Sequence, residues 1–189
     1  MIPDEKARRW RTMALAREAI ELGARVSIAA AFTGLPKYEV QRLFCDTETP
    51  GVSSGRQPWS AGWYLTESVV VEIQAAYFYA CFRQIRELGY PAADALVSGY
   101  KNYRRNFGHD PRLSFDRAFE LITHVEGLWS TKPPCLMTVV CHACKSTRLM
   151  LRADEPVGTG ECPFCKVART RNAWMLKTLV PSQSAEEAD

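Results

Sequence analysis

Four of the seven cysteines in this sequence stand in two pairs whose spacing is typical of a metal site. Cys141 pairs with Cys144 and Cys162 with Cys165, and residues 145–161 separate the pairs. A tight turn at each pair can direct two thiolates towards one ion, and the segment between them can bring the pairs together. Four thiolates complete a tetrahedral shell and leave no position for a substrate. We therefore predict one structural Zn²⁺ ion per chain, held by these four cysteines.

Disulfide or redox chemistry is the alternative use of these cysteines. An odd count of seven does not suit a set of disulfides, and the charged residues within 4–11 leave no room for the apolar core of a secretory signal. Glu72 and Gln74 interrupt the most apolar run, so we expect no membrane span. A cytoplasmic, reducing location follows, which favours zinc over disulfides. We expect the remaining cysteines to be ordinary buried residues: Cys45, Cys81 and Cys135.

Catalytic zinc is a second alternative, because deaminases also combine cysteines with zinc. They need a His-x-Glu element whose glutamate shuttles protons. The His-x-Glu pattern occurs at His124-Val125-Glu126, ahead of the first cysteine pair and within a predicted helix. This histidine would add a ligand to a set that is already complete, and no nucleophile, acid/base pair or phosphate loop stands out elsewhere. We therefore predict that the protein is not an enzyme.

Helical patterns fill the sequence ahead of the cysteines, with apolar residues at helical spacing and glycine or proline near the segment ends. The segment 66–88, with Thr66 as its cap, is apolar on nearly all faces. We expect it at the centre of the core, or covered by another subunit. The fold class is therefore mainly α, an all-helical body with a C-terminal, four-cysteine zinc-ribbon-like module. Helices are predicted over residues 4–22, 25–33, 37–44, 66–88, 92–107 and 114–128.

The domain organisation follows from Pro133-Pro134, which breaks the helical pattern before the cysteines. Beyond this break we expect a strand over 147–152 and a returning turn over 156–160. A polar, acidic composition closes the sequence and is typical of disorder. The predicted parts are a helical body (1–132), a zinc-binding module (133–180) and a disordered acidic tail (181–189).

The segment 25–44 fits a helix-turn-helix. Gly34 supplies the turn, Ala30 lets the two helices approach, and Val40 and Leu43 pack the second helix down. Such a pair of helices could read a major groove or grip phosphates, or it could be an ordinary corner of a helical core. The side chains that the second helix would expose are Lys37, Tyr38, Gln41 and Arg42.

Basic residues gather in and after the zinc module, although the net charge of +3 is mild. Such a cluster suits phosphate contacts, or it forms a solvated face. A further cation, Arg56, lies in the segment 46–62, where we expect Trp59 and nearby Trp63 to anchor the chain to the core or to contact a partner. The candidate DNA-binding residues are Lys37, Arg42, Arg56, Lys145, Arg148, Arg152, Lys166, Arg169 and Arg171.

Several local motifs follow one another in a distinctive order over about residues 10–169. They are Leu22-Gly23-Ala24-Arg25, Trp59 and Trp63-Tyr64 ahead of the long apolar helix, Arg117-Ala118-Phe119, the two cysteine pairs, and Pro156-Val157-Gly158 between those pairs. In this order they resemble the FlhC family of flagellar transcriptional activators. The position of the cysteine pairs behind an all-helical body makes the resemblance more specific than the pairs alone.

The resemblance implies a bacterial, DNA-binding transcriptional activator subunit that assembles with FlhD into a heterohexamer of four FlhD and two FlhC chains. Such a complex binds promoter DNA and activates flagellar operons together with RNA polymerase carrying sigma-70. The family's structural zinc would be held by the four cysteines already named. The alternative is a zinc-ribbon adaptor that binds protein without direct DNA contact, because structural zinc does not determine what the surface touches.

Overall fold

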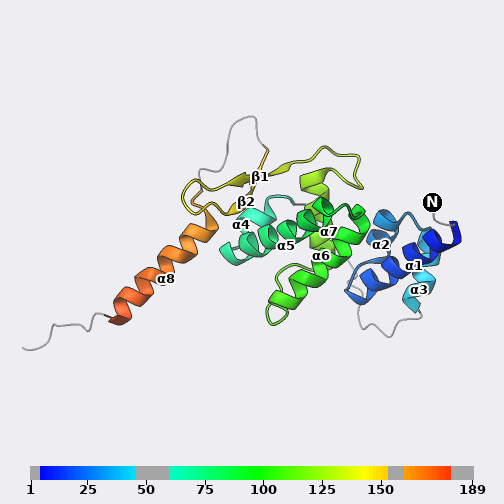
Figure 1. Cartoon of the computed structure of the whole chain (residues 1–189), viewed down its shortest axis with the longest axis horizontal. Coiled ribbons are helices and arrows are strands. Elements are labelled where there is room, and N and C mark those ends of the chain that lie inside the picture. Colours follow the sequence, from blue (N-terminus) through cyan, green and yellow to red (C-terminus); the bar gives the residue numbers. More distant parts are fainter. Residues whose placement is uncertain (1–4, 46–59, 153–159, 180–189) are drawn as a thin grey trace, which may run out of the picture.

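The computed structural model describes residues 5–45, 60–152 and 160–179. Within these ranges the protein is mainly α, with a C-terminal cluster of four cysteines, which confirms the predicted fold class (Figure 1). None of the helices described there is long and apolar enough to cross a membrane. The elements are α1 (Glu5–Glu21), α2 (Val26–Thr33), α3 (Lys37–Cys45), α4 (Trp63–Thr66), α5 (Val69–Glu87), α6 (Ala92–Phe107), α7 (Phe115–Glu126), β1 (Leu136–Val140), β2 (Thr147–Leu151) and α8 (Pro163–Leu179).

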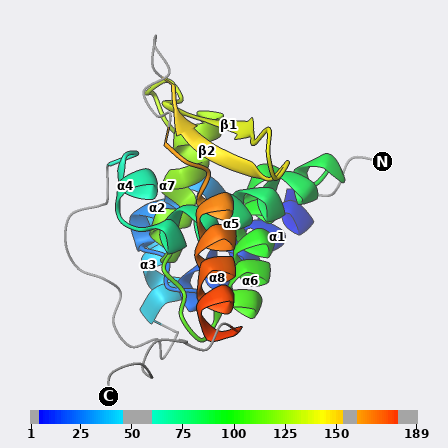
Figure 2. The ribbon, with the colours of Figure 1, turned by 90° about the vertical axis from the view of Figure 1, so that its left-hand side faces the viewer.

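Helix α5 lies at the centre of the core, as its apolar sequence predicts. It packs against α4, α6 and α7, and it also contacts β2 and α8 (Figure 2). Phe78 on α5 meets Tyr100 and Tyr103 on α6 edge to face, with ring centroids 6.2 and 6.3 Å away. Gly99 allows the close approach of α6, because a Cβ atom there would lie 3.2 Å from the backbone nitrogen of Phe82. The central helix is therefore covered largely by its own chain.

The predicted cap of this helix is wrong by two residues. The short helix α4 ends at Thr66, and Ser68 caps α5 with its Oγ, which accepts from the Val71 N–H at 3.2 Å. Ser68 has the extended backbone that an N-cap requires, with φ −169° and ψ 158°. The Thr66 hydroxyl instead donates to the carbonyl of Gly62 at 3.0 Å.

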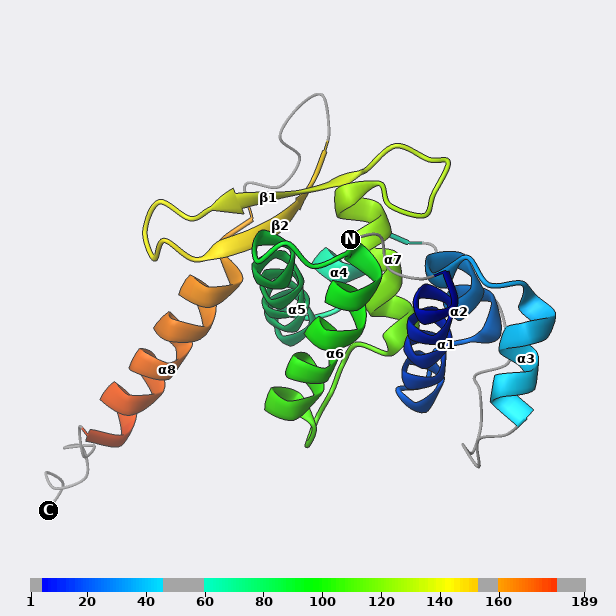
Figure 3. The ribbon, with the colours of Figure 1, turned by 45° about the vertical axis from the view of Figure 1, so that its right-hand side comes forward.

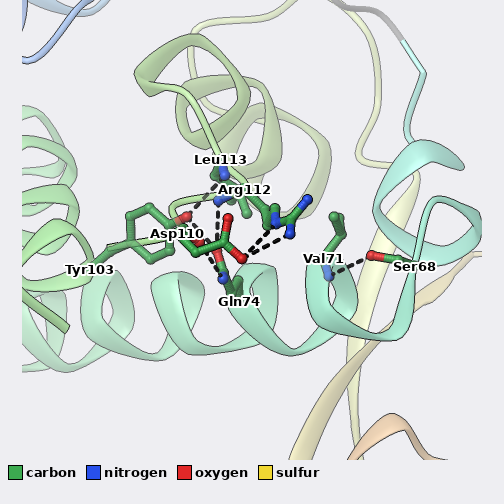
Figure 4. A network of polar contacts seen from close by, with 7 residues as sticks. All are labelled: Ser68, Val71, Gln74, Tyr103, Asp110, Arg112 and Leu113. Atoms are coloured by element: carbon green, nitrogen blue, oxygen red, sulfur yellow. Dashed lines mark hydrogen bonds and ion pairs between the residues drawn. The ribbon is translucent and has the colours of Figure 1, made fainter. Parts of the chain in front are cut away.

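A buried amide ties the connection between α6 and α7 to α5 (Figure 4). Gln74 is only 3% exposed, and its Oε1 accepts from the Tyr103 hydroxyl at 2.6 Å and from the Arg112 N–H at 2.8 Å. Its Nε2 donates to the Asp110 carbonyl at 3.0 Å. The Tyr103 oxygen accepts in turn from the Leu113 N–H at 2.9 Å. This network fixes the chain just before α7 begins.

Helices α1, α2 and α3 pack against one another at one end of the molecule (Figure 3). As predicted, α2 ends at Gly34, whose positive φ of 74° turns the chain towards α3. Ala30 and Val40 are buried, and Leu43 packs against the core. The helices and the turn of the proposed helix-turn-helix are therefore present, while its contact with DNA stays a prediction.

Strands β1 and β2 form an antiparallel hairpin in which Leu136 lies opposite Leu151. The strand predicted over 147–152 is observed as β2, whereas β1 was not predicted, and the predicted returning turn falls almost wholly outside the described residues. Leu136 and Leu149 are buried in the same apolar core as the helices. The hairpin thus shares its core with the body, and the division into body and module stays a prediction.

Candidate metal centre and basic surface

The first cysteine pair lies in the turn that joins β1 to β2. The Cys141 N–H donates to the Ser146 carbonyl, and the Lys145 N–H donates to the Cys141 carbonyl, each at 2.9 Å. Lys145 has a positive φ of 61°, which costs a residue with a side chain on the order of 1 kcal/mol. The turn therefore has a tight, hydrogen-bonded form that holds Cys141 and Cys144 close together.

The second pair does not lie on a similar turn, contrary to our expectation. Cys162 immediately precedes α8, and Cys165 lies in its first turn. The Lys166 N–H donates to the Cys162 carbonyl at 2.9 Å, which is the start of the helical hydrogen-bond ladder. Proline is favoured as the first residue of a helix, so Pro163 is the signal that could have predicted α8.

The four thiols meet in one cluster, all with sulfur atoms within 4.8 Å of one another. The Sγ atoms of Cys141 and Cys165 are 3.8 Å apart, and those of Cys144 and Cys162 are 3.7 Å apart. A tetrahedral ion with bonds of about 2.3 Å to sulfur requires sulfur atoms about 3.8 Å apart. The cluster therefore has the size and donor set to hold a metal ion.

Electrostatics in the cluster also favour a cation. Hydrogen bonds from Ser146 lower the pKa of the Cys144 thiol to about 6, and the backbone N–H groups of Cys144 and Ala143 lower the pKa of Cys141. The hydrogen bond between Cys165 and Cys144, followed by burial, raises the pKa of Cys165 to about 12, and burial raises that of Cys162. Thiols this close resist full ionisation unless a positive charge lies among them.

Three of the candidate DNA-binding residues in the module contact their own chain. Arg148 donates to the Gly160 carbonyl at 2.8 Å, Arg152 donates to the Leu136 carbonyl at 3.0 Å, and Arg169 pairs with Glu161 at 2.5 Å. These contacts tie together the two ends of the hairpin and the start of α8. The other three candidates in the module have exposed side chains: Lys145, Lys166 and Arg171.

A carboxylate on the central helix faces this basic surface. Burial raises the pKa of Glu72 on α5, and the positive charges of Arg148 and Lys166 oppose that rise. Both cations therefore lie near Glu72, although no feature of the sequence relates position 72 to positions 148 and 166. Sequence reasoning missed this contact between the body and the module.

The candidates on α3 lie far from the module, at the opposite end of the molecule (Figure 3). Lys37, Tyr38, Gln41 and Arg42 are all exposed on α3, as predicted. Tyr38 and Arg42 also line a cavity of about 410 Å³ between α1 and α3, together with Arg9. The candidates that the structure describes thus lie in two separate regions, helix α3 and the module. Residues 46–59 of the predicted loop fall outside the described residues, and Arg56 and Trp59 are among them.

The remaining sequence predictions concern single side chains. Trp63 is anchored to α7, because the Arg117 guanidinium lies 4.1 Å from the centre of its ring. Cys81 and Cys135 are half-buried rather than buried, and the Cys135 thiol lies 3.2 Å from Nδ1 of His124. The side chain of Cys45 falls outside the described part of the chain.

Comparison with known proteins places this arrangement in a family. The family model described as flagellar transcriptional activator (FlhC) matches residues 6–177, which include all four clustered cysteines. The flagellar transcriptional regulator FlhC of Xenorhabdus nematophila is 27% identical over 158 residues, which cover 80% of this chain and 77% of that protein. The protein of the same description from Sodalis glossinidius is 30% identical over 162 residues, 82% of this chain and 77% of its own length. The chain belongs to the FlhC family of flagellar transcriptional regulators.

Proposed function

We propose that this protein is the DNA-contacting subunit of a flagellar transcriptional activator. It acts in the cytoplasm with an FlhD-type partner, as a heterohexamer of four FlhD-type and two FlhC-type chains, at flagellar promoters with RNA polymerase carrying sigma-70. The family match over residues 6–177 carries the proposal, because it spans the helices and the cysteine cluster together. Exposed aromatic side chains at the α1–α3 end, Trp10 at 65% and Tyr38 at 66%, support the need for a partner.

The metal in this proposal is one structural Zn²⁺ ion. Four thiolates suit zinc and close its coordination shell, and the spacing of the sulfur atoms supports a tetrahedral ion. With no position left for substrate, the ion has a structural role, and the protein acts as a regulator rather than as an enzyme.

DNA contact is assigned first to the exposed cations of the module, Lys145, Lys166 and Arg171. Lys145 lies in the turn between the strands, and Lys166 and Arg171 lie on α8, where exposed cations can contact a phosphate backbone. The cations of α3, Lys37 and Arg42, form a second group at the other end of the molecule (Figure 3). A DNA duplex that contacts both groups would have to follow the length of the chain.

The direct test is co-expression with an FlhD-type partner, followed by mass determination, zinc analysis and binding to a flagellar promoter fragment over a salt series. We expect a zinc-loaded heterohexamer that binds the promoter in preference to random DNA. The plot of log K against log salt has a negative slope. Lys145→Glu and Arg171→Glu should each reduce the magnitude of that slope by about one unit. Lys101→Glu, a change on α6 at an exposed pair with Glu18, is the matched control and should leave the slope unchanged.

A protein-binding adaptor is the second candidate, and one observation favours it. Arg148, Arg152 and Arg169 contact their own chain, so fewer cations of the module remain for phosphates. In that case the assembled complex would load zinc but bind promoter and random DNA equally weakly. Charge reversal at Lys145 and Arg171 would then leave the salt slope unchanged.

A further inference from the structure

A cavity of about 350 Å³ lies where α7 meets the segment that leads into β1. The proposed function uses none of the side chains in it, and it is separate from the cysteine cluster. Several of the residues that line it carry polar or ionisable groups. The lining includes Glu120, Thr123, His124, Ser130, Lys132 and Cys135.

Cys135 and His124 form a thiol–imidazole pair in this cavity. The Sγ atom lies 3.2 Å from Nδ1, and the Cys135 N–H donates to the His124 carbonyl at 2.9 Å, which fixes the two residues relative to each other. The other ring nitrogen, Nε2, is buried and has no hydrogen-bond partner among the described residues, and it lies 3.9 Å from Oε2 of Glu120. The thiol thus lies at one ring nitrogen, and the Tyr64 ring packs edge-on against the imidazole.

The imidazole is the proton acceptor of the pair, because its Nδ1 atom lies within hydrogen-bond distance of the thiol. Burial, and then the positive charges of Lys132 and Arg117, lower the pKa of His124, so the ring is neutral at neutral pH and can accept a proton. The Glu120 carboxylate would stabilise the imidazolium that forms. The cavity thus holds a half-buried thiol at hydrogen-bond distance from a neutral base.

We propose that Cys135 is a modification site, a reactive thiol that small hydroperoxides oxidise with His124 as the base. With hydrogen peroxide, the thiol proton passes to Nδ1 and the sulfur attacks one peroxide oxygen. The O–O bond breaks, and the departing oxygen leaves as water after it takes the proton from His124. Sulfur loses two electrons and becomes a sulfenic acid, while the peroxide is reduced.

The position of Cys135 gives this reaction a structural effect. Its carbonyl accepts from the Arg152 N–H at 2.8 Å, so the residue joins α7 on one side to the end of the hairpin on the other. An added oxygen on Sγ would change the contact between the sulfur and Nδ1 of His124. Oxidation should therefore loosen the contact between the hairpin and α7.

The experiment uses the metal-loaded full chain, a short exposure to hydrogen peroxide, a reagent that traps sulfenic acids, and peptide mass spectrometry. Cys81 is the internal reference, because it is also half-buried but burial raises the pKa of its thiol. Cys135 should be trapped at least about tenfold faster than Cys81. Equal rates for the two thiols would overturn the proposal, and this comparison needs no variant.

A variant then tests whether His124 acts as the base. His124→Gln should lower the rate at Cys135 towards that of Cys81, whereas Thr123→Ala, in the same cavity, should not. Amide hydrogen exchange should also be faster at Arg152 after oxidation of the wild-type protein, and unchanged in Cys135→Ser given the same treatment. An undiminished rate in folded His124→Gln would remove the histidine from the reaction.

Discussion

At the scale of single residues, Gln74 should affect stability, because its side chain is buried and both polar atoms of its amide have hydrogen-bond partners (Figure 4). In Gln74→Leu the Arg112 N–H and the Asp110 carbonyl would lose their partners at the connection to α7. We expect the free energy of unfolding to fall by roughly 1–3 kcal/mol, which is the cost of leaving buried polar groups unpaired. Urea unfolding followed by circular dichroism measures this change.

Gln84 provides the matched control, because it lies on the same helix with an exposed side chain. Gln84→Leu makes the same chemical change without removing a buried partner, so its effect should stay within about 0.5 kcal/mol. Equal destabilisation by the two substitutions would show that the network in Figure 4 contributes little.

His124 should make stability depend on pH. Its pKa is lowered from the ordinary 6.5 by burial, Lys132 and Arg117, so the unfolded chain binds a proton that the folded chain does not. The contribution of the neutral ring to the free energy of unfolding is therefore complete above pH 6.5. It is lost as the pH falls through the pKa of the folded state, and the free energy of unfolding changes by at most about 1.4 kcal/mol per pH unit. The ionisable groups around the ring are Tyr64, Arg117, Glu120, Lys132 and Cys135.

Denaturant midpoints between pH 5 and 8 test this, with His124→Gln as the comparison. The wild-type protein should lose stability towards pH 5, and the variant should show a flatter profile over the same range. Parallel profiles would mean that other groups cause the pH dependence. His109, which is exposed, offers a control substitution, His109→Gln, that should keep the wild-type profile.

At the scale of elements, the caps show where sequence reasoning fails and how to test it. Ser68→Ala removes the side chain that accepts from the Val71 N–H and should cost about 1 kcal/mol. Thr66→Ala removes only a hydroxyl bonded to the Gly62 carbonyl at the end of α4, so its cost should be smaller. Thermal unfolding of the two variants side by side decides between the caps, and a larger loss for Thr66→Ala would reverse the assignment.

The helices of the body could be predicted because their signals are local. Ser114, the first residue of the predicted helix 114–128, caps α7 through the Arg117 N–H. Gly127, with a φ of 71°, ends the helix shortly before the predicted end. The choice between Thr66 and Ser68 depends on where α4 ends, and that is set by packing of Tyr64 into the core. Local pattern alone does not contain this information.

The metal cluster could also be predicted, since its spacing is a short-range feature of the sequence. Its surroundings could not, because they depend on contacts between distant segments. The pairing of Cys135 with His124 and the approach of Glu72 to Arg148 both arise when the hairpin packs on α5 and α7. Side chains that meet in this way leave no periodic pattern.

At the scale of the whole molecule, the hairpin connects the metal cluster with the helical core. Leu136 is fully buried and Leu149 is 5% exposed, both among the core side chains of the body. The hairpin therefore completes the core, and its position depends on the turn that carries Cys141 and Cys144. Loss of the metal should consequently lower the stability of the helices as well as that of the residues around the ion.

Cys144→Ser tests this coupling in full. With one ligand removed, bound zinc should fall well below one ion per chain, and the hairpin should lose its fixed turn. Exposure of the two leucines would then lower the free energy of unfolding of the helices by roughly 3–6 kcal/mol, at about 1.5–3 kcal/mol for each side chain. Metal analysis and urea unfolding measure both effects, and Cys81→Ser, outside the cluster, should change neither. Normal zinc content in Cys144→Ser would contradict the cluster as a metal site, and zinc loss with unchanged helix stability would show that the helical core is stable without the hairpin.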